Sequence, residues 1–218
     1  MPSLATIRKV LSKRFFGNLL PIPATNPFGL GAIAPPFDLL NVTAGERVKL
    51  LNYVGTRPSD PPQEKQPVLL CFSRIFAEKV YCPLCYPHIV ALNEQYEQFT
   101  QRGVAVMLIV STDPQQTKTV VQDLALKLPV LSDPTCRIFR LYRVGQALGA
   151  PLPAQFLIDL QGRIRFRHLF SFLEPNASVE RLLVACDRNA SPAGPSPLLA
   201  GKDGNTSTAT PPPAETLA

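Results

Sequence analysis

Val68-Leu69-Leu70-Cys71-Phe72, followed after a short interval by Tyr81-Cys82-Pro83-Leu84-Cys85, is the stretch of the 218-residue chain that decides the fold. The first segment is a continuous apolar run, which is typical of a strand buried on both faces. After the second segment, residues spaced alternately four and three apart predict one buried helix face, namely Cys85, Ile89, Leu92, Tyr96 and Phe99. This helix is expected to end near Gly103. Two cysteines therefore lie between a buried strand and a helix start.

The Cys82–Cys85 pair has two main interpretations, a zinc site or reversible disulfide chemistry. A structural zinc site needs four ligands. The sequence offers no second cysteine pair of similar spacing, and its histidines are His88 and His168. A place between a strand and a helix N-terminus is typical of a redox pair. We therefore interpret Cys82 and Cys85 as the redox-active, catalytic residues, and we expect no metal site.

The start of a helix favours the thiolate, the reactive form of cysteine, because unpaired N–H groups and the helix dipole stabilise an anion there. We expect Cys82 at the helix cap and Cys85 one turn into the helix. Pro83 suits the first helical position and limits the backbone freedom between the two sulfur atoms. Pro87 would remove a hydrogen bond from the second turn, so the alternative is a helix that kinks or that begins nearer Tyr86.

Three residues near the pair are candidates for stabilising the thiolate. His88 lies three residues after Cys85 and would add positive charge when protonated, although an ordinary surface histidine is the alternative. Arg74 and Lys79 precede the pair and would act in the same way, with a solvated charge as the alternative. Arg74 and His88 are therefore candidate supporting residues.

The other three cysteines are predicted to be structural. Cys71 lies in the apolar strand and Cys186 in an amphipathic last helix, which favours small core residues. Cys136 begins a helix, where packing is favoured and a distant resolving thiol is the alternative. Five cysteines at irregular spacing do not resemble a secreted disulfide framework, so we expect a reducing compartment, the cytoplasm.

Strands and helices alternate along the chain. The predicted strands, in order, are Phe37–Leu40, Val48–Leu51, Val68–Phe72, Val104–Val110, Leu128–Leu131, Gln155–Asp159 and Arg163–Leu169. Helices are opened by Thr112-Asp113-Pro114 and Ser132-Asp133-Pro134, and a last helix covers Ser178–Asp187. This order predicts an α/β fold with a central mixed β-sheet flanked by helices and an N-terminal β-hairpin extension.

Both ends of the chain differ in composition from its middle. We expect a basic amphipathic arm at residues 1–30, one domain at 31–188 and a tail at 189–218. The tail is rich in Pro, Ala, Ser and Thr, and it has too few large apolar residues to bury a core, so disorder is predicted.

The arm places Leu4, Ile7, Leu11 and Phe15 at helical spacing. A helix that packs on the domain is the favoured interpretation, because short apolar faces are common on surface helices. The alternatives are peripheral membrane contact through residues 1–24 and a transit peptide, since the arm lacks acidic residues.

The net charge of +6 comes mainly from the arm, which carries Arg8, Lys9, Lys13 and Arg14, while no acidic residue precedes Asp38. The rest of the chain is nearly balanced and has no cluster of Lys and Arg interleaved with aromatic residues. We therefore expect no nucleic-acid partner. No apolar run is long enough to span a bilayer.

Four segments in order carry a resemblance to a known family, from about Gly31 to Asp187. They are Ala34-Pro35-Pro36-Phe37-Asp38-Leu39, the Cys-Pro-Leu-Cys turn, Leu131-Ser132-Asp133-Pro134, and Pro153-Ala154-Gln155-Phe156-Leu157-Ile158-Asp159 before Gly162. In these segments the chain resembles the AhpC/TSA peroxiredoxin-like branch of the thioredoxin superfamily. The resemblance implies a thioredoxin-like fold, no metal or organic cofactor, a peroxide or disulfide as substrate, and an external thiol reductant such as thioredoxin or glutathione. Pro153 resembles the cis-proline that shapes the substrate groove in thioredoxins, with an ordinary strand-entry proline as the alternative.

The chain departs from the peroxiredoxin pattern in two places. Peroxiredoxins typically carry a threonine three residues before the reactive cysteine, where this chain has Lys79 before Cys82 and Cys82 before Cys85. The position of the peroxide-orienting arginine is taken by Pro153. Fast peroxide reduction is thereby in doubt, whereas dithiol–disulfide exchange is not.

Three functional hypotheses follow. The leading one is a thiol-dependent oxidoreductase that reduces peroxides or disulfides, with Cys82 as attacker by thioredoxin analogy and Cys85 as the alternative by peroxiredoxin alignment. The second is a protein-disulfide reductase without significant peroxidase activity. The third is a non-enzymatic, redox-responsive protein that binds a membrane or a partner through residues 1–24.

Overall fold

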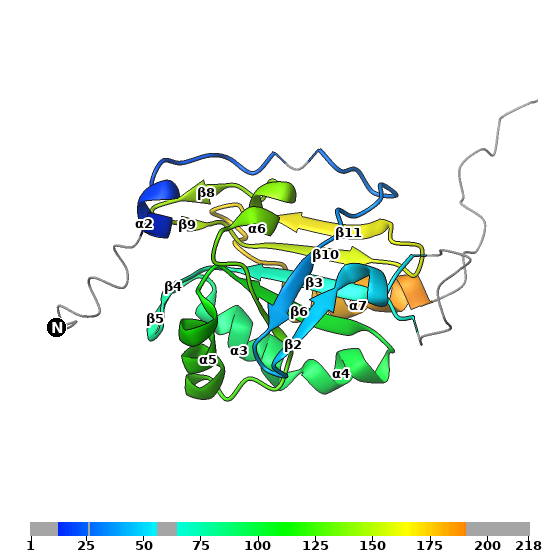
Figure 1. Ribbon diagram of the computed structural model, residues 1–218. Coiled ribbons are helices and arrows are strands. Elements are labelled where there is room, and N and C mark those ends of the chain that lie inside the picture. Colours follow the sequence, from blue (N-terminus) through cyan, green and yellow to red (C-terminus); the bar gives the residue numbers. More distant parts are fainter. Residues whose placement is uncertain (1–12, 26, 56–64, 191–218) are drawn as a thin grey trace, which may run out of the picture.

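A seven-stranded mixed sheet forms the centre of the computed structural model, which describes residues 13–25, 27–55 and 65–190 (Figure 1). Its spatial order is β11-β10-β3-β6-β7-β1-β2. The strand bounds are β1 Asp38–Asn41, β2 Glu46–Lys49, β3 Val68–Ser73, β6 Ala105–Val110, β7 Val130–Ser132, β10 Ala154–Ile158 and β11 Ile164–Leu169. The predicted α/β class with a central mixed sheet is confirmed.

Strands β3, β6 and β7 run parallel through the middle of the sheet. Val68 lies opposite Ala105, and Ser73 lies opposite Val110. Strand β10 pairs antiparallel with the other side of β3, so that Ala154 lies opposite Phe72. Because β3 has neighbours on both sides and is covered on both faces, its whole length is buried. The predicted opening hairpin, β1 and β2, joins this sheet through β7 and extends it.

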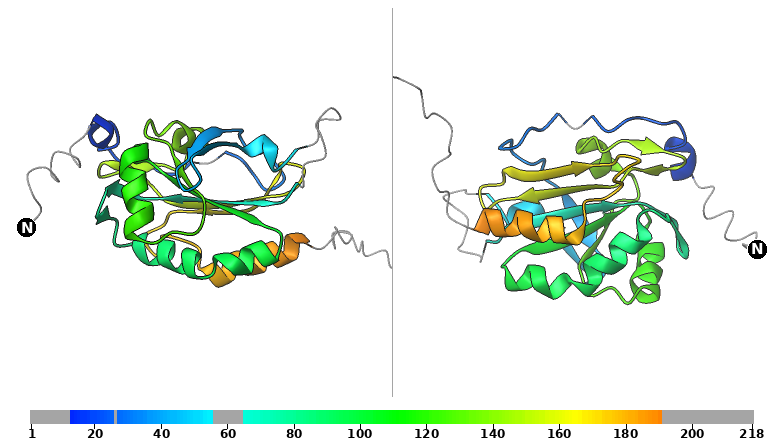
Figure 2. Two further views of the ribbon diagram at one scale, coloured as in Figure 1. Left: turned by 60° about the horizontal axis from the view of Figure 1, so that its bottom comes forward. Right: turned by 180° about the vertical axis from the view of Figure 1, so that it is seen from behind.

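Helices cover one face of the sheet, and a shorter helix with irregular chain covers the other (Figure 2). The helices of the first face are α3 Tyr86–Glu94, α4 Tyr96–Gln101, α5 Pro114–Asp123 and α7 Val179–Ala190. The other face carries α6 Arg137–Leu141, a 3-10 turn at Leu50–Asn52 and the chain that precedes β1. Alternate residues of β3 serve the two faces: Leu69 and Cys71 pack under α3, and Leu70 and Phe72 pack under α6.

The α6 face is held by an aromatic cluster. The ring of Phe72 contacts the rings of Phe139, Tyr142 and Phe156 at centroid distances of 5.1, 5.1 and 5.8 Å. The Tyr142 hydroxyl donates to the Pro35 carbonyl at 2.8 Å, so this buried polar group is satisfied. The cluster therefore fixes α6 and the chain before β1 on the sheet.

The capping prediction for α5 is confirmed, whereas the predicted start of the next helix is wrong, because α6 begins at Arg137 with Cys136 as its N-cap. The Asp113 carboxylate accepts from the backbone N–H of Gln116 at 2.9 Å. The Asp133 carboxylate accepts from the backbone N–H of Ile138 at 2.7 Å. Each aspartate satisfies a donor that the first helical turn leaves free.

The single helix predicted after the cysteine pair is wrong in one respect, because it is divided at Gln95. The backbone of Gln95, with φ −98° and ψ 11°, departs from helical geometry, so α3 ends at Glu94 and α4 begins at Tyr96. Gly103, with φ 66°, follows the end of α4 as predicted.

Two short hairpins were not predicted. The first pairs β4 Ile75–Ala77 with β5 Val80–Tyr81, and the second pairs β8 Gln146–Ala147 with β9 Ala150–Pro151. Strands of two or three residues are too short to show alternation of polar and apolar side chains. The first hairpin separates the buried strand β3 from the cysteine pair.

The described part of the arm packs on the domain. Helix α2 Lys13–Gly17 places Phe15 against Gly149, where an added Cβ would clash with the ring. Gly149 has φ 83°, a conformation that glycine adopts without strain. Further along, Ile22 and Gln146 exchange backbone hydrogen bonds of 2.8 Å. The segment therefore covers the β8–β9 hairpin.

The Arg14 side chain ties the arm to the end of the sheet. It donates to the carbonyls of Ile75, at 3.1 Å, and Phe76, and to the hydroxyl of Ser111. Burial lowers its pKa, and the nearby Cys136 and Asp113 oppose that shift.

Residues 1–12, which carry most of the predicted amphipathic pattern, and the predicted tail from 191 onward lie outside the described residues. The membrane-contact and transit-peptide alternatives and the boundaries of the three predicted parts stay predictions. Within the described part of the chain, no helix has both the length and the apolar character needed to cross a membrane.

Candidate functional site

The cysteine pair forms a tight turn immediately before α3. The backbone N–H groups of Cys85 and Tyr86 donate to the Cys82 carbonyl at 3.0 and 2.9 Å, and Ile89 N–H donates to the Cys85 carbonyl at 2.9 Å. Cys85 is the N-cap, so the expectation of Cys82 at the cap with Cys85 one turn inside is wrong. The alternative of a helix that begins near Tyr86 is confirmed. Pro87 is the reason, because it takes the second helical position, where its missing N–H has no intrahelical partner to lose.

The turn polarises the two thiols in opposite directions. A hydrogen bond from the Cys85 side chain is the largest cause of a lowered Cys82 pKa, which falls to about 6. Backbone N–H groups of Leu84 and Cys85 and the charge of Arg74 act in the same direction, while burial opposes them. The same thiol–thiol hydrogen bond, together with burial, raises the pKa of Cys85. These shifts favour the thiolate on Cys82 and the protonated thiol on Cys85.

Arg74 follows β3 and is buried, so the alternative of a solvated charge is wrong. Its Nη2 group donates to the carbonyls of Ala147 and, at 3.1 Å, Leu148 on the β8–β9 hairpin. Its Nε group is buried without a partner. Burial lowers the Arg74 pKa, and the charges of Cys82 and Cys85 oppose that shift. The guanidinium therefore lies within electrostatic reach of the pair. The Arg74 backbone N–H also donates toward the Cys85 sulfur.

His88 does not add positive charge to the pair. Burial lowers its pKa to about 4, which leaves the ring neutral near pH 7, and the nearby His168 acts in the same direction. The Nε2 atom is buried and has no partner, while a hydrogen bond with the Ala177 backbone opposes the shift. The expectation that His88 adds positive charge near Cys85 is therefore wrong, because its ring is buried near the Ala177 backbone.

The two prolines of the predicted site lie in different surroundings. Pro83 is exposed in the turn between the two cysteines, so its expected place at the first helical position is wrong, because α3 begins at Tyr86. Pro153 is buried directly before β10. Because Ala154 lies opposite Phe72, Pro153 lies near the end of β3 that leads into Arg74. No peptide bond is cis among the described residues, so the expectation of a cis bond at Pro153 is wrong. The alternative of a strand-entry proline describes its backbone.

Two site residues were missed by the sequence reasoning, Gln155 and Asn176. The Asn176 side-chain amide donates to the carbonyl of Leu84, inside the cysteine turn, at 3.0 Å. Gln155, which is fully buried on β10, donates to the Asn176 side-chain oxygen at 2.9 Å. The signal that could have found Gln155 was a polar amide inside the apolar run Ala154–Ile158. No pattern around Asn176 pointed to its role.

The remaining cysteines are buried away from this turn. Cys71 and Cys186 pack in the core under the helices, as predicted, and burial raises the pKa of both, that of Cys186 to about 12. Cys136 belongs to the hydrophobic cluster on the other face, with the Asn18 amide 3.6 Å from its sulfur. Within the described ranges, no three His, Cys, Asp or Glu side chains are grouped so that they could hold a metal ion.

Comparison with known proteins gives one family and a set of similar folds. The sequence model described as the AhpC/TSA family matches residues 30–167. The reduced 2-Cys peroxiredoxin of Plasmodium vivax is similar, with 23% identity and a TM-score of 0.60, over 74% of this chain and 81% of that one. Peroxidoxin BcpB of Mycobacterium tuberculosis has 17% identity and a TM-score of 0.59, over 74% and 97%.

A third solved structure belongs to a different type of thiol protein. The putative thiol:disulfide interchange protein DsbE of Chlorobium tepidum has 23% identity and a TM-score of 0.54, over 73% of this chain and 99% of that one. No curated protein matches the chain. At these identities the solved structures show a shared thioredoxin-like fold.

Proposed function

The chain belongs to the AhpC/TSA family, and from this premise we propose that it is a thiol-dependent oxidoreductase in which Cys82 attacks the substrate and Cys85 resolves the product. The opposite polarisation of the two thiols carries the proposal. A lowered Cys82 pKa, to about 6, supplies the nucleophile at neutral pH. The raised pKa of Cys85 supplies a proton donor beside it and keeps the resolving sulfur unreactive until it is needed.

With a peroxide as substrate, the Cys82 thiolate attacks one oxygen, an S–O bond forms and the O–O bond breaks. The leaving oxygen takes a proton and departs as water or an alcohol, and Cys82 becomes a sulfenic acid. The Cys85 thiol then attacks the Cys82 sulfur, an S–S bond forms and water leaves. An external reductant, either the dithiol thioredoxin or two molecules of the monothiol glutathione, reduces the disulfide, is itself oxidised to a disulfide, and restores both thiols.

With a disulfide as substrate, the Cys82 thiolate attacks one sulfur and forms a mixed disulfide, while the other sulfur leaves as a thiolate. The Cys85 sulfur, after losing its proton, attacks Cys82 and releases the second thiol of the substrate. Pro153 lies at the end of β3 that leads into Arg74, and Arg74 interacts electrostatically with both cysteines. We assign Pro153 and Arg74 the walls of the substrate groove. Pro83 restricts the loop that the disulfide closes.

Neither route needs a metal or an organic cofactor, and both suit a reducing compartment such as the cytoplasm. A specific observation favours protein-disulfide reduction as the second candidate. The Arg74 guanidinium is engaged by the carbonyls of Ala147 and Leu148, and Pro153 replaces the arginine that orients peroxide in peroxiredoxins. The groove therefore offers few free donors to a peroxide oxygen.

Two assays run in parallel test the proposal. Peroxide consumption coupled to thioredoxin and thioredoxin reductase is compared with insulin-type disulfide reduction, for the unaltered protein and for Cys82→Ser, Cys85→Ser and the double variant. We expect each single serine to abolish turnover in whichever assay is active, and oxidised protein to contain a Cys82–Cys85 bridge by peptide mass mapping. Turnover that survives the double variant would refute the proposal. Activity in the insulin assay alone selects the disulfide reductase.

A further inference from the structure

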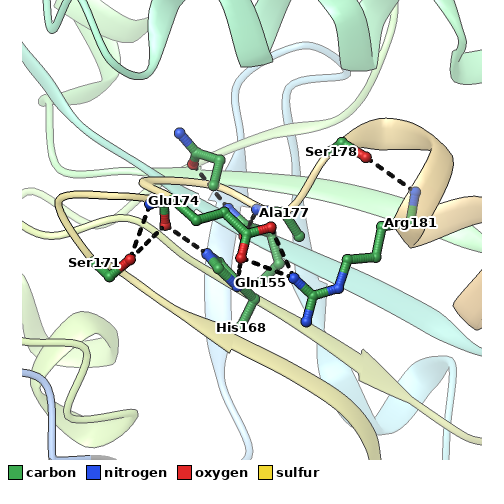
Figure 3. Close-up of polar contacts among 8 residues, drawn as sticks. Gln155, His168, Ser171, Glu174, Ala177, Ser178 and Arg181 are labelled. Carbon is green, nitrogen blue, oxygen red and sulfur yellow. Dashed lines mark hydrogen bonds and ion pairs between the residues drawn. The ribbon is translucent and has the colours of Figure 1, made fainter.

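A chain of amide hydrogen bonds connects the core of the sheet with the cysteine turn. The Gln155 side chain accepts from the backbone N–H of Ala177 at 3.0 Å and donates to the side-chain oxygen of Asn176 at 2.9 Å. Asn176 in turn donates from its Nδ2 to the carbonyl of Leu84 at 3.0 Å. Figure 3 shows Gln155 between the sheet and the loop that carries Ala177. This series of hydrogen bonds ends on the peptide between Leu84 and Cys85, within the redox turn.

The loop that carries Asn176 is itself anchored at both sides. Glu174 accepts from Arg181 on α7 at 2.8 Å through its carboxylate, and its backbone carbonyl lies 3.0 Å from the His168 ring (Figure 3). Its backbone N–H donates to the Ser171 hydroxyl at 2.9 Å. These contacts hold the loop to β11 and α7, so the Asn176 amide reaches the turn from a fixed position.

Peptide geometry turns this contact into an effect on Cys82. In a planar trans peptide, the C=O and the N–H point in opposite directions. Fixing the Leu84 carbonyl on Asn176 therefore turns the N–H of Cys85 the other way, toward Cys82, where it donates to the carbonyl at 3.0 Å. The same N–H lowers the pKa of Cys82, as the smaller of two backbone contributions after that of the Leu84 N–H. A free peptide could rotate and lose both contacts.

We propose that Asn176, held by Gln155, is a positioning residue of the redox turn, which locks the peptide between Leu84 and Cys85 so that its N–H stays directed at Cys82. Asn176 donates to the Leu84 carbonyl rather than to a sulfur, so it acts through the peptide. The inference rests on the proposed function, because it assumes that the Cys82 thiolate is the working nucleophile. The inference assigns part of the reactivity of Cys82 to a residue that lies 92 positions after Leu84 in the sequence.

The titratable groups that act on Cys82 are Cys85 in the same turn and Arg74 after β3. Asn176 donates its hydrogen bond to the Leu84 carbonyl and not to either of these groups, and the neutral His88 adds no charge. A change at Asn176 therefore reaches the Cys82 thiol through the orientation of the backbone donor.

The test measures the pH profile of Cys82 alkylation in the full-length protein, with iodoacetamide as the probe and peptide mass mapping to identify the modified thiol. We expect Asn176→Ala to slow the reaction near pH 6 by about fivefold and to leave the plateau at high pH unchanged, because one donor to the thiolate is lost. A merely structural change would lower stability without moving the midpoint. An unchanged profile overturns the inference.

Two further variants keep the test decisive. Asn176→Asp retains the acceptor for Gln155 and removes the donor to Leu84, so it tests the lost donor even if Asn176→Ala fails to fold. Its alkylation profile is measured with and without about 1 M salt, which screens the added negative charge. A shift that persists in salt supports the inference, and a shift that vanishes overturns it. Ser171→Ala removes a contact of the same loop and should leave the profile unchanged. An equal shift in Ser171→Ala overturns the inference, because general order of the loop would then be the cause.

Failure of the inference is distinct from failure of the proposed function. If the unaltered protein shows an acidic Cys82 and the Asn176 variants share its profile, the inference alone fails. If the unaltered protein shows no acidic Cys82 and forms no Cys82–Cys85 bridge, both fail.

Discussion

Two pairs of buried cysteines in the same molecule differ in their surroundings, and only one thiol of the four, Cys82, has a lowered pKa. Cys82 and Cys85 are 5% and 1% exposed in the turn, and Cys71 and Cys186 are each 1% exposed in the core, where they interact with one another. Burial pushes the pKa upward in all four. Only the turn supplies Cys82 with backbone donors, a neighbouring thiol donor and a guanidinium, which together reverse the shift. The difference teaches that the donors around a buried sulfur decide its reactivity.

The largest expected effect separates the two pairs by substitution. Cys82→Ser or Cys85→Ser should reduce turnover by about 100-fold or more, because each removes one partner of the disulfide. Cys71→Ala and Cys186→Ala should change turnover by less than about twofold and cost about 1 kcal/mol of stability through lost packing. Steady-state rates and thermal unfolding measure both. Loss of turnover in the core variants at unchanged stability would break the comparison.

The second prediction separates the pairs by pH. Since the Cys82 pKa is lowered to about 6, its thiolate is fully present above about pH 7 and is lost as the pH falls through 6. Alkylation at pH 5 should therefore be about tenfold slower than at pH 7. Cys71 and Cys186 should stay unmodified over this range until the protein unfolds. Time-resolved mass spectrometry checks both, and early modification of Cys85 in place of Cys82 would contradict the assignment.

The third prediction removes the cation near the turn. Arg74→Met should slow Cys82 alkylation near pH 6 by about threefold to tenfold, because the positive charge that favours the thiolate is lost. The matched control is Arg140→Met, an exposed arginine on α6. An equal effect in both variants would show that net charge, rather than the position of Arg74, sets the reactivity.

The smallest effect is expected from His88. Because burial holds its pKa at about 4, the ring carries no charge near pH 7, and His88→Asn should change Cys82 alkylation there by less than about twofold. A large slowing at pH 7 without loss of thermal stability would show that the ring is protonated beside the pair. The same pH series as for Arg74 supplies the measurement.

Much of the sheet could be predicted because its central strands bury nearly every residue. The runs Val68–Phe72 and Val104–Val110 are apolar in the sequence for the same reason that they lie side by side in the core. Asp113 could be placed at a helix start because a cap is a local interaction between residues a few positions apart. Asp133 binds backbone N–H groups of α6 from outside the helix, which begins at Arg137 rather than at Pro134.

The site could be predicted only in part, because its details depend on contacts between distant segments. The cysteine spacing identified the pair, but the state of His88 depends on its packing under the segment around Ala177. Likewise, the contact of Asn176 with Leu84 spans 92 residues. The β4–β5 hairpin turns at Lys79, a residue with φ 59° that gives no turn signal. Long-range packing of this kind leaves little trace in a single sequence.

The anchoring of Arg14 sets a practical limit on how far the chain can be trimmed from its start. A shortened protein that begins after Gly17 would leave the carbonyls of Ile75 and Phe76 and the Ser111 hydroxyl without their donor, at the end of the sheet next to the β4–β5 hairpin. A truncation intended to separate targeting from thiol chemistry should therefore stop before Lys13, so that any change in behaviour can be assigned to the residues removed.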